Sequence, residues 1–78
     1  MERKELAKEI AGFATRYSLF NNSKNINENS IEKGLSDSWF VEYLILTLFE
    51  VRDKKDIDFE KLKELLDELE EVRLENVI

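Results

Sequence analysis

Residues 39–51 constrain the fold of this chain more than any other segment. Ten of these thirteen residues are apolar, and only Glu42, Thr47 and Glu50 are polar. On a helix with about 100° between successive residues, apolar side chains project in every direction, so the segment has no polar face. A helix of that kind has to be covered all round. A chain of 78 residues has few elements for this, which predicts tight packing, a partner, or both.

Composition narrows the ways in which so short a chain can be stabilised. A domain of this size buries only about 60% of the surface that its unfolded chain exposes, which leaves its stability marginal. The sequence has no Cys and no His, so it offers no disulfide and no thiolate or imidazole ligand for a metal. We therefore expect a single helical domain over residues 1–78, without a cofactor or metal, that is completed by dimerisation.

Helix breakers are scarce, which predicts an all-α fold. There is no Pro and there are only two Gly, while Leu, Glu, Lys and Ala are abundant. The periodicity predicts a small three-helix bundle with an almost fully apolar central helix, a polar loop and one possible extra turn of helix. The helices are expected at about 2–19, 37–52 and 58–75, the loop at 21–30 and the extra turn at 31–35.

Two local features refine this prediction. Short polar residues before the expected helices supply N-caps: Ser36, Asp37 or Ser38 for the central helix, and Asp56 or Asp58 for the last. Gly12 and the alanines beside it would let another helix approach the first one closely, although Gly costs up to about 1 kcal/mol of helix propensity.

A strand is the alternative for residues 39–51, because Trp, Phe, Val, Tyr and Ile are good strand formers. Thirteen residues is long for a strand, however, and no second apolar run could pair with it. We therefore favour the helix.

Charge and length weigh against binding to nucleic acid or membrane. The net charge is −6, and the basic residues near the N-terminus, Arg3, Lys4 and Lys8, alternate with acids. A helix-turn-helix can be drawn with residues 39–51 as the recognition helix, but its start offers the major groove no Arg, Asn or Gln. The apolar run is also shorter than the roughly 20 residues of a membrane span. The charged N-terminus is unlike a secretory signal, so we expect a cytoplasmic protein.

The polar segment 21–32 has the spacing of a calcium-binding loop. Side-chain oxygens recur at the liganding positions Asn21, Ser23, Asn25, Asn27, Asn29 and Glu32. Only one of these six residues is a carboxylate, and Ile26 stands where such a loop needs Gly. We therefore do not expect calcium binding.

The sequence also indicates that the protein is not an enzyme. Without His or Cys, catalysis would rest on carboxylates, Lys or hydroxyls, and nearly all acidic clusters fall on helix faces expected to be exposed. Glu42 and Glu50 are the exceptions, and we expect each to be held in a structural ion pair with a base such as Arg16 or Arg52. No catalytic or cofactor-binding residue is predicted, and no motif identifies a family.

The most nearly polar sector of the central helix is the candidate partner interface. It contains Trp39, Tyr43, Leu46 and Glu50, and Trp and Tyr are favoured at the centres of interfaces. The competing interpretation is that Trp39 and Tyr43 complete the core of the monomer and keep their polar tips in water. Both remain open at this point.

Two functions follow. The first is a small interaction or regulatory module that acts by helix-mediated self-association or by binding another protein. The second is an acidic inhibitor or immunity-type protein that blocks a nucleic-acid-binding protein through a stripe of acidic residues on the last helix. The alternative interpretation of this stripe is that it is the solvent-exposed side of an amphipathic helix. The acidic stripe comprises Glu60, Glu64, Asp67, Glu68, Glu71 and Glu75. Binding through the acids would weaken steeply with salt, whereas binding through the aromatic sector would hardly change.

Overall fold

The structure is a computed structural model that describes residues 1–20 and 26–76. Within these ranges it contains helices and no strand, so the predicted all-α class is confirmed and the strand alternative for residues 39–51 is wrong. The helices are α1 (Arg3–Arg16), α2 (Glu28–Gly34), α3 (Ser38–Glu50) and α4 (Phe59–Asn76).

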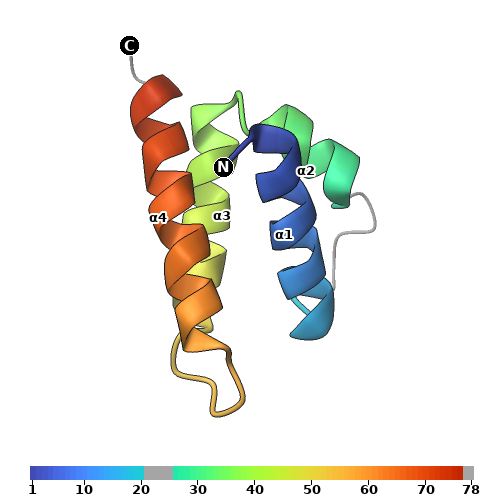
Figure 1. Cartoon of the computed structure of the whole chain (residues 1–78), viewed down its shortest axis with the longest axis vertical. Coiled ribbons are helices and arrows are strands. Elements are labelled where there is room, and N and C mark those ends of the chain that lie inside the picture. The colour runs from blue at the N-terminus through green and yellow to red at the C-terminus, as the bar shows by residue number, and fades with distance from the viewer. Residues whose placement is uncertain (21–25, 77–78) are drawn as a thin grey trace.

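The helices pack as two neighbouring pairs (Figure 1). In one pair α1 lies against α2, in the other α3 lies against α4, and α1 also contacts α4. The apolar side chains between the pairs form one core, and none of the buried residues that the structure describes is polar or charged. Ten of these side chains are almost completely buried: Leu6, Ile10, Ile31, Leu35, Val41, Leu44, Leu48, Leu62, Leu65 and Leu69.

Helix α2 begins earlier than the sequence indicated. Residues 28–30 were expected in the polar loop, but Asn27 forms a capping box: its side chain accepts a hydrogen bond from the Ser30 N–H (3.0 Å), and the Ser30 hydroxyl accepts one from the Asn27 N–H (2.8 Å). This cap satisfies two otherwise free donors and starts the helix at Glu28. Residues 21–25 of the expected loop lie outside the described residues.

Helix α1 ends at Arg16, three residues before the predicted end, in a Schellman motif. The Leu19 N–H donates to the Ala14 carbonyl (2.8 Å) and the Ser18 N–H to the Thr15 carbonyl (3.3 Å). Ser18 takes a left-handed conformation with φ 55°, the position that glycine usually fills in this motif. The chain thus leaves the helix at a residue whose type did not signal it.

We expect Ser18→Gly to raise the free energy of unfolding by about 0.5–1 kcal/mol. Glycine adopts a positive φ without the steric cost that Ser pays there. Urea denaturation followed by circular dichroism measures the change. Ser36→Gly is a control outside a helix and without a positive φ, and it should not stabilise the protein. Equal effects of the two substitutions would contradict the explanation.

The N-caps of α3 and α4 are residues that the sequence predicted for this role. Asp37 accepts a hydrogen bond from the Trp39 N–H (2.9 Å) and caps α3. Asp58 accepts one from the Lys61 N–H (3.1 Å) at the start of α4. The Asp58 N–H in turn donates to the Tyr17 hydroxyl (2.7 Å). This bond fixes the start of α4 to the end of α1.

The two glycines have opposite surroundings. Gly12 was expected to let another helix approach, but it is exposed, and a Cβ placed there would have nothing within 4 Å. The close approach occurs instead at Gly34, where a Cβ would collide with the ring of Phe40. Glycine at position 34 therefore leaves room for the aromatic side chain that starts α3.

Candidate functional site: an apolar face along α3 and α4

Helix α3 is divided lengthwise into a buried and an exposed side. Val41, Leu44 and Leu48 are completely buried. The opposite side exposes large apolar groups: Trp39 is 84% exposed and Leu46 58%. All four residues of the predicted interface sector, Trp39, Tyr43, Leu46 and Glu50, lie on this exposed side.

The exposed side is wider than the predicted sector. Phe49 is 47% exposed and Tyr43 44%, so the aromatic surface continues to the end of α3. On α4, Phe59 and Leu74 are 59% and 60% exposed. The predicted sector did not include Phe49, which lies about 60° from Leu46 around a helix with 100° per residue. It did not include Phe59 either, because the spacing of this residue places it with the leucines of its helix; its place one residue after the cap leaves it at the end of the core.

An ion cluster shows that the exposed sides of α3 and α4 adjoin. Arg73 Nη1 lies 3.6 Å from the Glu42 carboxylate, and Arg73 Nη2 also contacts Glu70 on its own helix. The hydrogen bond that Arg73 donates to the Glu70 carboxylate, with a smaller contribution from Glu42, raises the pKa of Arg73. Phe59 and Leu74 lie within about 100° of Arg73 around α4, given 100° per residue. Phe59 and Leu74 therefore lie along the same edge of α4 as Arg73, the edge that adjoins α3.

We call the resulting surface the α3/α4 face, which has the six exposed members Trp39, Tyr43, Leu46, Phe49, Phe59 and Leu74.

One margin of the α3/α4 face is closed by aromatic contacts. The Tyr43 ring lies 5.8 Å from the ring of Phe20 and 6.1 Å from that of Phe40, between centroids. Tyr43 therefore contributes to packing while staying half exposed. Trp39, at 84% exposure, adds almost nothing to the core, so the interpretation that it completes the core of the monomer is wrong.

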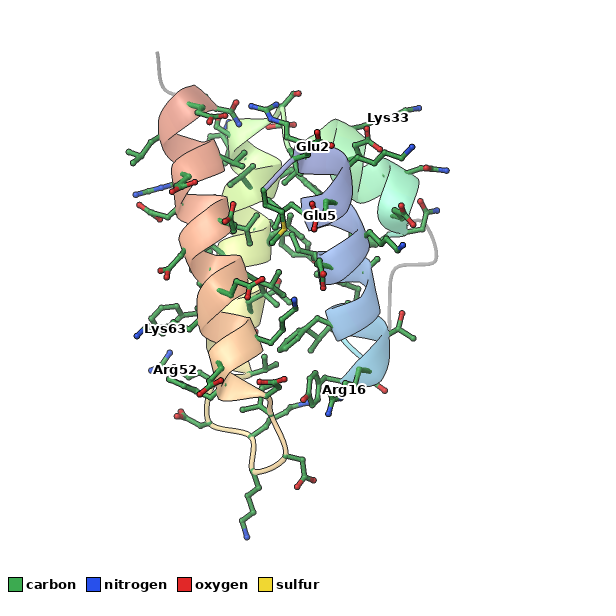
Figure 2. The ribbon with its side chains drawn as sticks, in the orientation of Figure 1. Glu2, Glu5, Arg16, Lys33, Arg52 and Lys63 are labelled. Carbon is green, nitrogen blue, oxygen red and sulfur yellow. The ribbon has the colours of Figure 1, made fainter. Side chains whose placement is uncertain are left out.

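The end of the α3/α4 face near the α3–α4 turn carries basic side chains. The Arg52 guanidinium lies over the Phe49 ring, 4.4 Å from its centroid, and donates to the Phe49 carbonyl (3.2 Å). Figure 2 shows Arg52 and Lys63 projecting from the same end and side of the α3–α4 pair. Glu42 forms an ion pair, as expected, but with Arg73 instead of Arg16 or Arg52, whereas Glu50 has no ion pair with another described residue; both carboxylates are exposed.

The predicted acidic stripe does lie on the outer side of α4, but half of it is engaged in ion pairs. Glu64 contacts Lys61 (3.3 Å), Glu75 contacts Arg3 (3.2 Å), and Glu68 lies 3.4 Å from the amino group of Met1.

Lys61 also contacts Glu9 (2.9 Å). The hydrogen bond that the Lys61 ammonium donates to the Glu9 carboxylate is the main reason why the pKa of Lys61 is raised. This stabilisation is therefore present at neutral pH and is lost only in alkaline solution, as the pH rises through that pKa.

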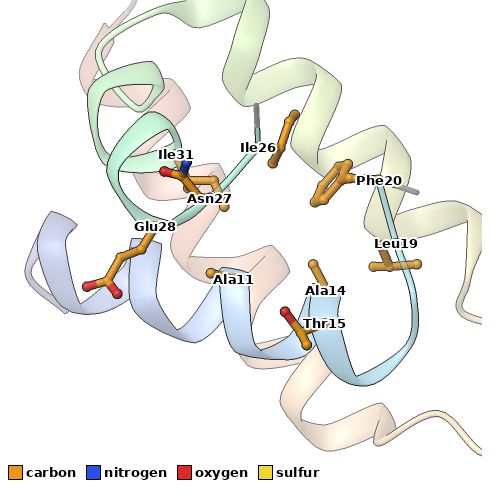
Figure 3. Close-up of a pocket in the computed structure, with 9 residues that line it drawn as sticks. All are labelled: Ala11, Ala14, Thr15, Leu19, Phe20, Ile26, Asn27, Glu28 and Ile31. Atoms are coloured by element: carbon orange, nitrogen blue, oxygen red, sulfur yellow. The ribbon is translucent and has the colours of Figure 1, made fainter. Parts of the chain in front are cut away.

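A separate pocket lies between α1 and α2 (Figure 3). It has a volume of about 210 Å³ and is lined mostly by apolar side chains, among them Ala11, Phe20 and Ile31, together with the polar Thr15 and Asn27 and one charged residue, Glu28. Asn27, one of the six residues at the spacing of a calcium-binding loop, uses its side-chain oxygen to cap α2. Asn21, Ser23 and Asn25 lie outside the described residues. Among the residues that are described, no group of acidic side chains is placed to hold a metal ion.

Comparison of the chain with protein-family models, with curated proteins and with solved structures found no match in any of the three. Among the described residues, no helix is both long enough and apolar enough to cross a membrane. The α3/α4 face itself is therefore the basis for inferring function.

Proposed function

We propose that this protein is a non-enzymatic interaction module that works by self-association through the α3/α4 face. The observation that carries the proposal is the exposure of six large apolar side chains on adjoining sides of two helices, with Trp39 at 84% the most exposed. Trp and Tyr are enriched among the residues that dominate binding energy at interfaces. The occupant that we propose is a second copy of the chain.

The size of the α3/α4 face supports this occupant. If a fully exposed large side chain presents roughly 150–250 Å², the six side chains together expose on the order of 700 Å². The largest apolar patch on a typical monomer is about 300–600 Å². A standard interface buries about 800 Å² on each partner. The face therefore exceeds what a small monomer usually exposes and is close to what one side of a dimer needs.

The charges around the α3/α4 face also fit a second copy. The protein as a whole carries a net charge of −6, which would favour a basic partner. Around this face, however, acids and bases are nearly equal in number, so the surface attracts neither a strongly basic nor a strongly acidic partner. The acids are Asp37, Glu42, Glu50 and Glu70, and the bases are Arg52, Lys63 and Arg73.

The structure lends less support to the alternative function, an acidic inhibitor that acts through α4. A surface that imitates a phosphate backbone needs free negative charge. Three of the six acidic residues of the stripe instead take part in ion pairs. Glu60, Asp67 and Glu71 remain exposed and carry no salt bridge to another described residue.

Light scattering from micromolar to millimolar concentration tests the proposal. We expect the unmodified protein to be a dimer at the higher concentrations. Leu46→Glu should raise the dissociation constant at least about 100-fold, because a carboxylate would be buried in an apolar interface without a partner. Thr15→Glu adds the same charge at an exposed position of α1 and is the matched control, which should dimerise normally.

Two results would overturn the proposal. One is a monomer throughout the concentration range, and the other is an equal effect of Leu46→Glu and Thr15→Glu. Circular dichroism of both variants establishes that each is folded before the comparison is made. If the protein is monomeric but binds polycations with a steep salt dependence, the acidic stripe on α4 becomes the better candidate. A cytoplasmic location stays a prediction, which fractionation of cells expressing the tagged chain would check.

A further inference from the structure

We infer that the two copies meet in an antiparallel arrangement, with α3 of one running against α3 of the other about a twofold axis between Tyr43 and Leu46. This inference rests on the self-association proposed above. It states which parts of the α3/α4 face meet across the interface. In a twofold interface the same patch serves both copies, so the patch has to be complementary to itself.

The turn end of the α3/α4 face is the more basic end. Arg52 lies over the Phe49 ring at the end of α3, with its guanidinium at the margin of the apolar surface. Lys63, four residues after Phe59 on α4, projects from the same end (Figure 2). Glu50 is the acid of α3 at this end, and the turn after Arg52 adds two acids, Asp53 and Asp56, and two bases, Lys54 and Lys55. The charges of the turn cancel, so that Arg52, Lys63 and Glu50 leave a sum of about +1 at neutral pH.

The opposite end of the α3/α4 face is the more acidic end. Here Arg73 is shared between Glu42 and Glu70, so the cluster keeps one uncompensated negative charge. Asp37, the cap of α3, adds another. Antiparallel packing brings the basic end of each copy against the acidic end of the other. Parallel packing would bring the two basic ends together and the two acidic ends together, which is repulsive.

The spacing along α3 also favours an axis between Tyr43 and Leu46. With this axis, residues whose numbers sum to 89 lie opposite each other, so that Tyr43 meets Leu46 and Trp39 meets Glu50 and its neighbour Phe49. Glu42 then lies opposite Thr47. An axis at Leu46 would instead set Glu42 against Glu50, two like charges at close range. The chosen axis therefore matches apolar groups and keeps the two carboxylates apart.

Helix α4 fits the same arrangement. Rotation about a twofold axis perpendicular to the helices brings α4 of one copy to the same side of the α3–α3 contact as α4 of the other copy. The two α4 helices therefore also run antiparallel to each other. Phe59 and Leu74 are fifteen residues apart, which is about 22 Å along the helix. They lie at opposite ends of α4, so the antiparallel arrangement turns the Phe59 end of one copy towards the Leu74 end of the other.

Single-cysteine cross-linking tests the arrangement, since the chain has no cysteine of its own. Leu46→Cys lies next to the proposed axis, and the shortest bis-maleimide should join most of the protein into covalent dimers. Glu50→Cys lies about 16 Å along the helix from its equivalent in the other copy, beyond the reach of this reagent. It should give no more product than Thr15→Cys, an exposed control on α1.

Efficient cross-linking of Glu50→Cys to itself would overturn the proposed arrangement, because its axis keeps the two copies of residue 50 about 16 Å apart, whereas parallel packing brings them together. A dimer by light scattering in which neither Leu46→Cys nor Glu50→Cys cross-links above the control would also overturn it. Both of these results leave self-association intact. A monomer by light scattering of the unmodified protein would instead contradict the proposed function itself, so the two failures are distinguishable.

Discussion

Leu44→Ala is expected to lower the free energy of unfolding by about 2–5 kcal/mol, the usual range for truncating a buried leucine. Leu44 is completely buried in the core beneath α3, and the lost contacts leave a cavity that the surrounding side chains fill only in part. Folded domains have about 5–15 kcal/mol of stability in total, and a chain of 78 residues is expected near the lower limit. Urea denaturation followed by circular dichroism at low micromolar concentration measures the loss.

Leu46→Ala is the matched control, because it makes the same change two residues later on the same helix. Leu46 is 58% exposed, so the free energy of unfolding of the monomer should change by less than about 0.5 kcal/mol. Its effect should be on the dimer instead. Equal losses of monomer stability from Leu44→Ala and Leu46→Ala would show that the assignment of buried and exposed sides of α3 is wrong.

Gly34→Ala is expected to lower the free energy of unfolding by about 1–3 kcal/mol, the usual cost of overpacking. A methyl group at this position would overlap the ring of Phe40. The side chain of Phe40 would have to leave its place against the core, together with its contact with Tyr43. The loss should exceed what alanine contributes through its better helix propensity, which is at most about 1 kcal/mol.

Gly12→Ala should have the opposite sign. Gly12 lies inside α1, is exposed, and has free space where the methyl group would go. The substitution should therefore raise the free energy of unfolding by about 0.5–1 kcal/mol through helix propensity alone. The same urea titration measures both variants. Stabilisation by Gly34→Ala would contradict the close packing of Phe40 against α2.

Much of the fold follows from the sequence because strong local signals agree with the packing. Asp37 and Asp58 were expected as caps, and each accepts a backbone hydrogen bond at the start of its helix. Leu6, Ile10 and Phe13 recur at helical spacing in the sequence, and all three are buried. The caps act on neighbours within three residues and the apolar spacing repeats along one helix, so a local sequence pattern contains both signals.

Other features depend on contacts that a local pattern does not contain. The end of α1 depends on Ser18 taking a left-handed conformation, which its residue type does not announce. A close approach was predicted at Gly12 and occurs at Gly34, because only the packing shows which glycine another side chain approaches. The partner of Glu42 is Arg73, thirty-one residues further along the chain.

The candidate interface could be predicted in part. Trp39, Tyr43, Leu46 and Glu50 fall on one exposed side, as a helix with 100° per residue requires. The contribution of α4 could not be predicted, because it depends on how the ends of the two helices align. Phe59 begins α4 just beyond the turn and is therefore 59% exposed, although its spacing places it with the buried leucines.

None of the buried residues that the structure describes is polar or charged. This property affects how such a protein can evolve. The most exposed side chains of the proposed interface, such as Trp39 and Leu46, share no hydrogen bonds with the buried residues, so changes at these positions or in the surface charges should leave the core packing nearly unaltered. Mutations at sites without shared contacts tend to combine additively. The same scaffold could therefore acquire a new partner through a few surface substitutions, with little loss of stability to be compensated.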